Sequence, residues 1–253
     1  MSLNLVDLIR SALNYKKPIN TKHLPSQGLF YKNDFKIRIS KADEEDIKNY
    51  ERDFKKNLNT VVYQIKKIVR KNIFFSNEYK FNDLKSIDIV YVFLEIVKFT
   101  RNKSIKIKHS SEKEIEFNSK NFNYFKIDEN TMRYYEEDEQ CFRISNYKYT
   151  LPTIGIEISL TNYLGKKSLE PDSEKYNDYF YDFIYFLGNK SELSFTEIDN
   201  LIQIFNFDLN VSELAKIKDI INRFLPIQIY SLIKGDEVID INAMINLEDI
   251  WNK

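Results

Sequence analysis

The sequence predicts an α+β fold that is mainly helical, with a β-rich central insert and a C-terminal hairpin. Three observations carry this prediction. Apolar residues before residue 103 and after residue 150 recur at steps of three and four, which is typical of helices. Between these two stretches they alternate with charged residues, which is typical of half-buried strands. The composition, 43% hydrophobic and 15% aromatic, provides enough apolar side chains for a sizeable core.

The changes of pattern divide the chain into three regions. Residues 1–102 form an N-terminal turn-strand and helical region, residues 103–150 a β-rich insert, and residues 151–253 a C-terminal helical region with a terminal hairpin. No repeat, flexible linker or low-complexity segment separates these regions. One compact domain overall therefore remains an alternative to separate domains.

The first elements are a helix, a turn, a strand and a second helix start. An amphipathic helix is expected over residues 3–13, and Pro25 and Gly28 then indicate a turn. An alternating strand follows over residues 35–39. Four carboxylates at positions 43–46 come next, and they suit the positive end of a helix dipole.

Two longer helical patterns complete the N-terminal region. Residues 61–69 carry an apolar side, and the basic side chains opposite it indicate a solvated face: Lys66, Lys67, Arg70 and Lys71. The strongest helix is predicted from Asp83 to Arg101, with Asp83 or Ser86 as its cap. This helix is apolar on more than one side, so we expect it to be central in the N-terminal half.

The insert is predicted to contain a hairpin and further strands. Isoleucines at 105 and 107 alternate with lysines, and apolar residues at 115 and 117 alternate with glutamates, as in a hairpin. Residues 122–127 and 141–150 are expected to form strands, the latter with a tight turn at 145–146. The acidic run at 136–139 between them is expected to be an exposed loop.

The last region returns to helical patterns. Leu151-Pro152-Thr153 is expected to open a helix, because proline suits a first turn. An aromatic helix is predicted over 176–187, and Ser194 to Glu197 fit a capping box at the start of the next helix. A further helix over 212–224 and a hairpin within 227–241 follow.

Composition disfavours several classes of function. The 38 basic and 38 acidic residues cancel, whereas nucleic-acid binding usually depends on excess lysine and arginine, so a nucleic-acid partner is disfavoured. The single cysteine cannot form a disulfide within the chain. The most apolar run, residues 87–99, contains three charged residues and is too short to cross a membrane, and the N-terminus lacks the apolar stretch of a signal peptide.

No catalytic, cofactor or metal motif is found. His23 and His109 lack partners at metal-ligand spacing, and we expect both at the surface. Cys141 follows an acidic run, which should raise its pKa and make it a poor nucleophile. A phosphate loop ending at Gly165 would need a glycine where Leu160 stands. We therefore expect no enzyme activity, no cofactor, no small-molecule substrate and no bound metal.

Two segments resemble one family. The first is Leu24-Pro25-Ser26-Gln27-Gly28-Leu29-Phe30-Tyr31, followed by Ile37-Arg38-Ile39 and Asp43-Glu44-Glu45; the second is Tyr147-Lys148-Tyr149-Thr150-Leu151-Pro152-Thr153-Ile154-Gly155. They resemble the small baseplate hub and hub-assembly proteins of T-even-like contractile-tailed bacteriophages. The likeness covers residues 1–165 and, loosely, the remainder. Some relatives carry cysteine pairs in the central β region, and residues 103–127 have none here.

The resemblance implies a structural component of a phage contractile-tail baseplate, at or near the central hub. It implies protein–protein contacts with other phage tail and baseplate proteins, without catalysis. The implied locations are the tail baseplate of the virion and, during assembly, the host cytoplasm. Two alternatives stay open: a hub assembly chaperone absent from the mature virion, and an unrelated nucleic-acid-associated binding protein.

Seven residues of the two segments are candidates for partner binding: Leu24, Pro25, Leu29, Phe30, Tyr31, Leu151 and Pro152. The turn before Leu29 is expected to lead into an edge strand, whose unpaired backbone groups could accept a strand of the partner. The alternative, equally open, is that the turn links two packed elements and that the large apolar side chains belong to the core.

Overall fold

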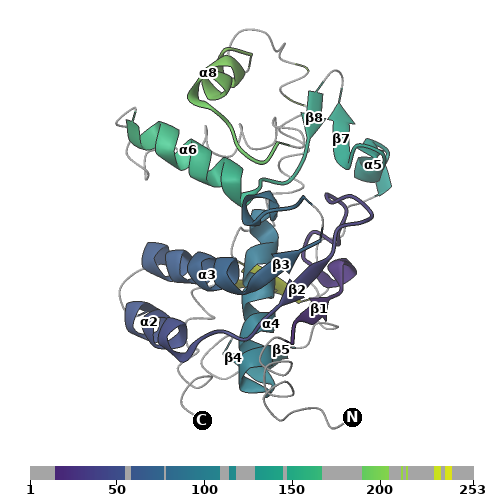
Figure 1. Cartoon of the computed structure of the whole chain (residues 1–253). Helices are drawn as coiled ribbons and strands as arrows, with labels where there is room; N and C mark the ends of the chain where they lie inside the picture. Colours follow the sequence, from purple (N-terminus) through teal and green to yellow (C-terminus); the bar gives the residue numbers. More distant parts are fainter. Residues whose placement is uncertain are drawn as a thin grey trace, which may run out of the picture.

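The computed structural model describes the larger part of the chain: residues 15–54, 58–76, 78–108, 114–117, 129–144, 147–166, 190–204, 212, 215, 231–234 and 237–240. Helices and small antiparallel sheets share this part, which confirms the α+β class (Figure 1). Several predicted elements lie outside the described residues: the helices over 3–13 and 176–187, most of that over 212–224, the strand over 122–127 and the turn at 145–146.

The first sheet has three short antiparallel strands, β1 (Lys17–Ile19), β2 (Ile37–Ile39) and β3 (Ile73–Phe75). Ile37 and Ile39 are buried and Arg38 is exposed, as the alternation predicts. The expectation of an edge strand here is wrong, because β2 pairs with β1 on one side and β3 on the other. Both neighbours come from other parts of the sequence, so the local pattern could not reveal them.

Helices α2 (Glu44–Phe54) and α3 (Leu58–Asn72) follow β2 and lead to β3. Within the acidic start of α2, Asp46 is buried and binds Lys71 of α3, with Nζ 2.9 Å from the carboxylate. A second lysine of α3, Lys66, lies 2.8 Å from the buried carboxylate of Glu157. Lys67 lies 3.8 Å from Asp46 as well. The basic side of α3 is therefore only partly a solvated face, because three of its lysines connect it to other helices.

Helix α4 (Ile89–Arg101) is central, as predicted, with residues 89–97 all buried. Its predicted start at Asp83 is wrong. Residues 81–83 and 86–88 form two separate 3₁₀ turns, η2 (Phe81–Asp83) and η3 (Ser86–Asp88), and Asp88 is the N-cap residue. Neither Asp83 nor Ser86 caps the helix, because the chain between the two turns is extended and bonds to the segment before α6.

The insert contains the predicted hairpin, β4 (Ile105–Lys108) paired with β5 (Glu114–Phe117). After α5 (Glu129–Met132), a second sheet follows: β6 (Tyr135–Glu136), β7 (Cys141–Ile144) and β8 (Tyr147–Tyr149). The expected acidic loop is wrong at its first residue, since Glu136 belongs to β6. Only residues 137 and 138 of the run are exposed.

The C-terminal region begins with α6 (Ile154–Lys166), as the sequence predicts. Pro152 lies before the helix, in an extended segment, and not in its first turn. Helix α8 (Phe195–Gln203) starts with the predicted capping box: the Ser194 side chain accepts from the N–H of Glu197, whose carboxylate accepts from the N–H of Ser194. Strands β9 (Ser231–Lys234) and β10 (Glu237–Asp240) pair antiparallel.

One hydrophobic cluster joins these elements. It takes side chains from all three predicted regions, among them Phe30, Phe93, Phe117, Phe142 and Leu160. The described part of the chain contains no helix with the length and apolarity needed to span a membrane. The candidate site lies where the turn before β2, the turns before α4 and the segment before α6 meet.

Candidate functional site

The first part of the site is the turn from Leu24 to Tyr31. Gln27 and Gly28 both have positive φ, 55° and 76°. A Cβ at Gly28 would meet its nearest neighbour at 3.5 Å, so the backbone conformation and not the available space favours glycine. This reversal buries Leu24 and directs the side chains of Ser26 and Tyr31 into the protein.

Asp88 receives both of these side chains at the start of α4. Its Oδ1 accepts from the N–H of Ser26 at 2.8 Å, and its Oδ2 accepts from the Ser26 hydroxyl at 2.8 Å and the Tyr31 hydroxyl at 2.6 Å. Asp88 is fully buried. A buried carboxylate is tolerated only when donors satisfy it, and here the turn supplies them. These bonds explain why the Asp88 side chain does not cap α4.

Burial dominates the ionisation of this pair. It raises the pKa of Asp88 to about 6, although the hydrogen bonds from Tyr31 and Ser26 act in the opposite direction. Burial also raises the pKa of the Tyr31 hydroxyl well above its ordinary value, and the neighbouring Asp88 charge raises it further. Tyr31 therefore remains a neutral donor to Asp88 at any pH at which the protein is commonly handled.

Lys85 connects the turn to the second segment of the resemblance. Its backbone N–H donates to the Tyr31 hydroxyl at 2.8 Å, and its side-chain Nζ donates to Thr150 Oγ1 at 3.1 Å. The side chain is buried, with 3% of the residue exposed. Burial lowers the pKa of this amine to about 8, against the opposing effect of Asp88 and Asp83.

The second segment pairs directly with residues 84–86. The N–H of Ser86 donates to the Pro152 carbonyl and the N–H of Ile154 to the Leu84 carbonyl, both at 2.9 Å. The first turn of α6 then packs tightly against the chain before α8: a Cβ placed on Gly155 would lie 2.1 Å from the carbonyl oxygen of residue 191. The two segments that carry the resemblance, more than a hundred positions apart, therefore meet on residues 84–88.

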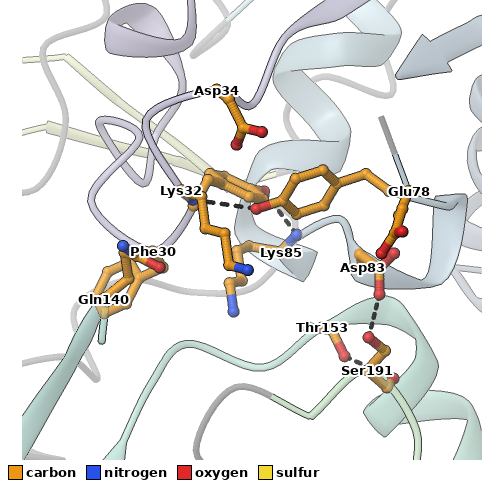
Figure 2. A pocket seen from close by; sticks show the side chains of 11 residues that line it. Phe30, Lys32, Asp34, Glu78, Asp83, Lys85, Gln140, Thr153 and Ser191 are labelled. Carbon is orange, nitrogen blue, oxygen red and sulfur yellow. Dashed lines mark hydrogen bonds between the residues drawn. The ribbon is translucent and has the colours of Figure 1, made fainter. Parts of the chain in front are cut away.

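A cavity of about 460 Å³ lies beside this meeting point (Figure 2). Its lining combines aromatic, acidic, basic and neutral polar side chains: Phe30, Tyr31, Lys32, Asp34, Glu78, Tyr79, Asp83, Lys85, Gln140, Thr153 and Ser191. Asp88 does not line it. Of the lining residues, Lys85 combines deep burial with a side chain that ionises near neutral pH. Such combinations are frequent at binding sites.

The predicted partner-binding residues all lie around this meeting point, but their side chains face inward. Six of the seven are buried and Leu29 is half-buried: Leu24, Pro25, Phe30, Tyr31, Leu151 and Pro152 are the buried ones. Of the seven, Phe30 and Tyr31 line the cavity. The burial of the six agrees with the alternative that the turn links packed elements. Their role in partner binding stays a prediction.

Cys141 lies in a small acidic cluster with Glu136 and Glu139, whose potential ligand atoms are within 4.8 Å of one another. Arg143 binds both glutamates, and Lys148 lies 2.5 Å from Glu139. As predicted, the pKa of the thiol is raised, first by burial and then by Glu139. A protonated thiol beside carboxylates already paired with cations is a poor donor set for a metal.

Sequence reasoning missed both Lys85 and Asp88 as site residues. Both fall within the helix predicted from residue 83, and an isolated charged residue in such a helix is expected to face solvent. One signal was present: Asp88 stands inside the most apolar run of the chain. Of the two histidines, His23 is half-buried in the 3₁₀ turn η1 (Thr21–His23), and His109 lies outside the described residues.

No family model, curated protein or solved structure matches this chain.

Proposed function

We propose that this chain is a structural component of a phage contractile-tail baseplate, at or near the central hub. It acts through contacts with other tail and baseplate proteins, in the virion and, during assembly, in the host cytoplasm. It uses no cofactor and catalyses no reaction.

One observation carries the proposal: the two segments that resemble the baseplate family meet in space. The turn of the first segment binds Asp88 through Ser26 and Tyr31, and the second segment pairs with residues 84–86. Chance likenesses in two short, distant stretches have no reason to share one structural unit. If the family shares a unit in which this turn and this extended segment both pack on the start of one helix, the two likenesses are expected to lie together.

The partner surface is proposed to lie over this unit and not in its buried side chains. Leu29 is half-buried within it and is the member of the predicted set best placed for contact. Other large apolar side chains of the described residues are exposed and are separate candidates for partner contact: Tyr15, Tyr63, Tyr134 and Ile158. Tyrosine is enriched among the residues that dominate binding energy at protein interfaces.

The test is quantitative mass spectrometry of purified particles of the source phage, with the infected-cell lysate run in parallel. A constant ratio of this chain to tail-tube and hub proteins in the particle would support a built-in component. Presence in the lysate together with absence from the particle would instead support the assembly chaperone. If the gene lies outside any phage genome, both baseplate readings are wrong.

A further inference from the structure

The ammonium group of Lys85 has fewer acceptors than its burial demands. It carries three N–H donors, and Thr150 Oγ1 accepts one of them. Among the residues that the structure describes, no carboxylate lies within ion-pair distance of Nζ. The rings of Phe30 and Tyr31 lie 6.0 Å away, at the outer limit of a cation–π contact. A buried ammonium in these surroundings favours an additional anionic acceptor.

The two nearest carboxylates in the sequence do not pair with this ammonium and accept hydrogen bonds from other groups. Asp88 is occupied by donors from the turn, as described above, and does not line the cavity. Asp83 accepts from the Ser191 hydroxyl and from the N–H of Lys80. The free donors of Lys85 therefore remain available to a molecule that enters the cavity.

The charges of the cavity wall restrict what that molecule can be. Lys32 adds a second cation, and three carboxylates face the same space, from Asp34, Glu78 and Asp83 (Figure 2). A phosphate dianion would be repelled by three carboxylates, whereas a group with one negative charge can pair with Lys85 at lower cost. The aromatic wall of Phe30, Tyr31 and Tyr79 suits a flat apolar remainder.

From this geometry we infer that the cavity is a binding site for a carboxylate, held by the ammonium of Lys85, in a ligand that carries no further negative charge. A small metabolite or a carboxylate-bearing segment of a protein could present this group. The volume of about 460 Å³ falls in the range of small-ligand sites. The inference does not depend on the baseplate proposal, since it follows from the cavity alone.

The test uses hippurate, an aromatic amide with one carboxylate, and its neutral amide, hippuramide, titrated into the full-length chain by calorimetry. We expect hippurate to bind about tenfold more tightly than hippuramide or better, because only the carboxylate forms charge-assisted hydrogen bonds. Inorganic phosphate is expected to bind more weakly than hippurate. Equal affinity for hippurate and hippuramide, or no binding of hippurate at about 10 mM, would overturn the inference.

Matched variants identify the residue responsible. Lys85→Met keeps the length of the side chain and removes its charge, and we expect it to lower hippurate affinity about tenfold. Lys48→Met is the control, because the Lys48 side chain is 75% exposed and lies on α2, outside the cavity lining. Undiminished binding by a folded Lys85→Met variant would refute the assignment. If that variant does not fold, the comparison of hippurate with hippuramide on the wild-type chain still decides.

A last measurement separates the two sources of the carboxylate. Native mass spectrometry of the chain purified from its own host would detect a small monocarboxylate as an added mass that is lost on unfolding. If a protein supplies the group, hippurate is expected to compete with that partner and to release it from the wild-type chain. Either result supports the site, and the calorimetric outcomes above remain the ones that can reject it.

Discussion

The buried carboxylate of Asp88 should make the stability of this protein depend on pH in an unusual direction. Most carboxylates in folded proteins have a lowered pKa and stabilise the fold as pH rises. Burial instead raises the pKa of Asp88 from 3.8 to about 6. A raised pKa means that the folded state binds the proton more tightly than the unfolded chain does. The protonated Asp88 side chain therefore contributes fully to the free energy of unfolding below pH 3.8, and this contribution is lost as pH rises through about 6.

The size of the effect follows from the shift. A rise of about 2 pH units corresponds to about 3 kcal/mol of folding free energy. About 2 kcal/mol of this falls between pH 4 and pH 7, because the unfolded chain already begins to ionise near pH 4. Lys85, the neighbouring amine, stays protonated in both states over this range, since its pKa is lowered only to about 8. Its charge therefore does not change in the window measured.

The variant Asp88→Asn isolates the contribution, because asparagine does not titrate. Urea unfolding of wild type and variant is compared at several pH values from 4 to 7. Loss of hydrogen bonds from Ser26 and Tyr31 is expected to lower variant stability by about 1–3 kcal/mol at low pH, and this deficit should shrink as pH rises. The test is the slope: wild type should lose about 2 kcal/mol relative to the variant as pH rises.

A control and a contrary result complete this experiment. Asp138→Asn, at an exposed position of the acidic run, gives the change expected of a surface carboxylate. A flat difference between wild type and Asp88→Asn would show that the Asp88 carboxyl does not change its protonation on folding. A difference of opposite sign would show that the donors of the turn outweigh burial, and the account given for Asp88 would then be wrong.

Three further predictions concern single contacts. Tyr31→Phe should lower the free energy of unfolding by about 3 kcal/mol, because it removes a donor to Asp88 and leaves the buried N–H of Lys85 unsatisfied. Tyr63→Phe, at a 64% exposed position, should change this free energy little. Gly155→Ala should lower the free energy of unfolding by about 3 kcal/mol, because its Cβ would clash with the backbone of residue 191. Gly165→Ala, on the same helix in open space, should raise it by up to about 1 kcal/mol. Equal effects of the two substitutions would refute the close approach at Gly155. Lys85→Met should raise stability at pH 7 by about 1–3 kcal/mol, because a buried ammonium is replaced by an apolar chain. Thermal and urea unfolding measure all five variants, and a less stable Lys85→Met would mean that the fold needs this charge.

The elements predicted correctly are those determined by neighbouring residues. The capping box at Ser194 involves residues three positions apart, and its two bonds form within one turn of chain. The hairpin of β4 and β5 likewise follows from alternation within two adjacent segments. Local propensity and the final structure agree in these places, so the sequence alone was sufficient.

The predictions that failed depend on contacts between distant residues. The helix expected from Asp83 begins only at Ile89, because residues 84–86 bond to the segment around Pro152 and cannot join the helix. The helical periodicity through residue 87 reflects the burial of Ile87, which lies in the 3₁₀ turn η3 and not in α4. Strand β2 became central for the same reason, since its partners come from elsewhere in the chain.

The candidate site could not be predicted because its chemistry depends on which charged groups are satisfied. Asp88 and Lys85 are three positions apart, both buried and of opposite charge, yet their side chains do not form an ion pair. Asp88 receives its donors from one turn of its own chain, so it fixes the position of that turn. Lys85 receives one hydroxyl and faces a cavity. A buried charged group whose hydrogen-bond partners all come from the protein fixes the positions of those partners. A buried charged group with unused donors beside a cavity can bind a ligand. The two substitutions should therefore separate these roles. Asp88→Asn is expected to destabilise the chain at low pH and to leave the Lys85 ammonium in place. Lys85→Met is expected to stabilise the chain and to lower its affinity for a carboxylate about tenfold.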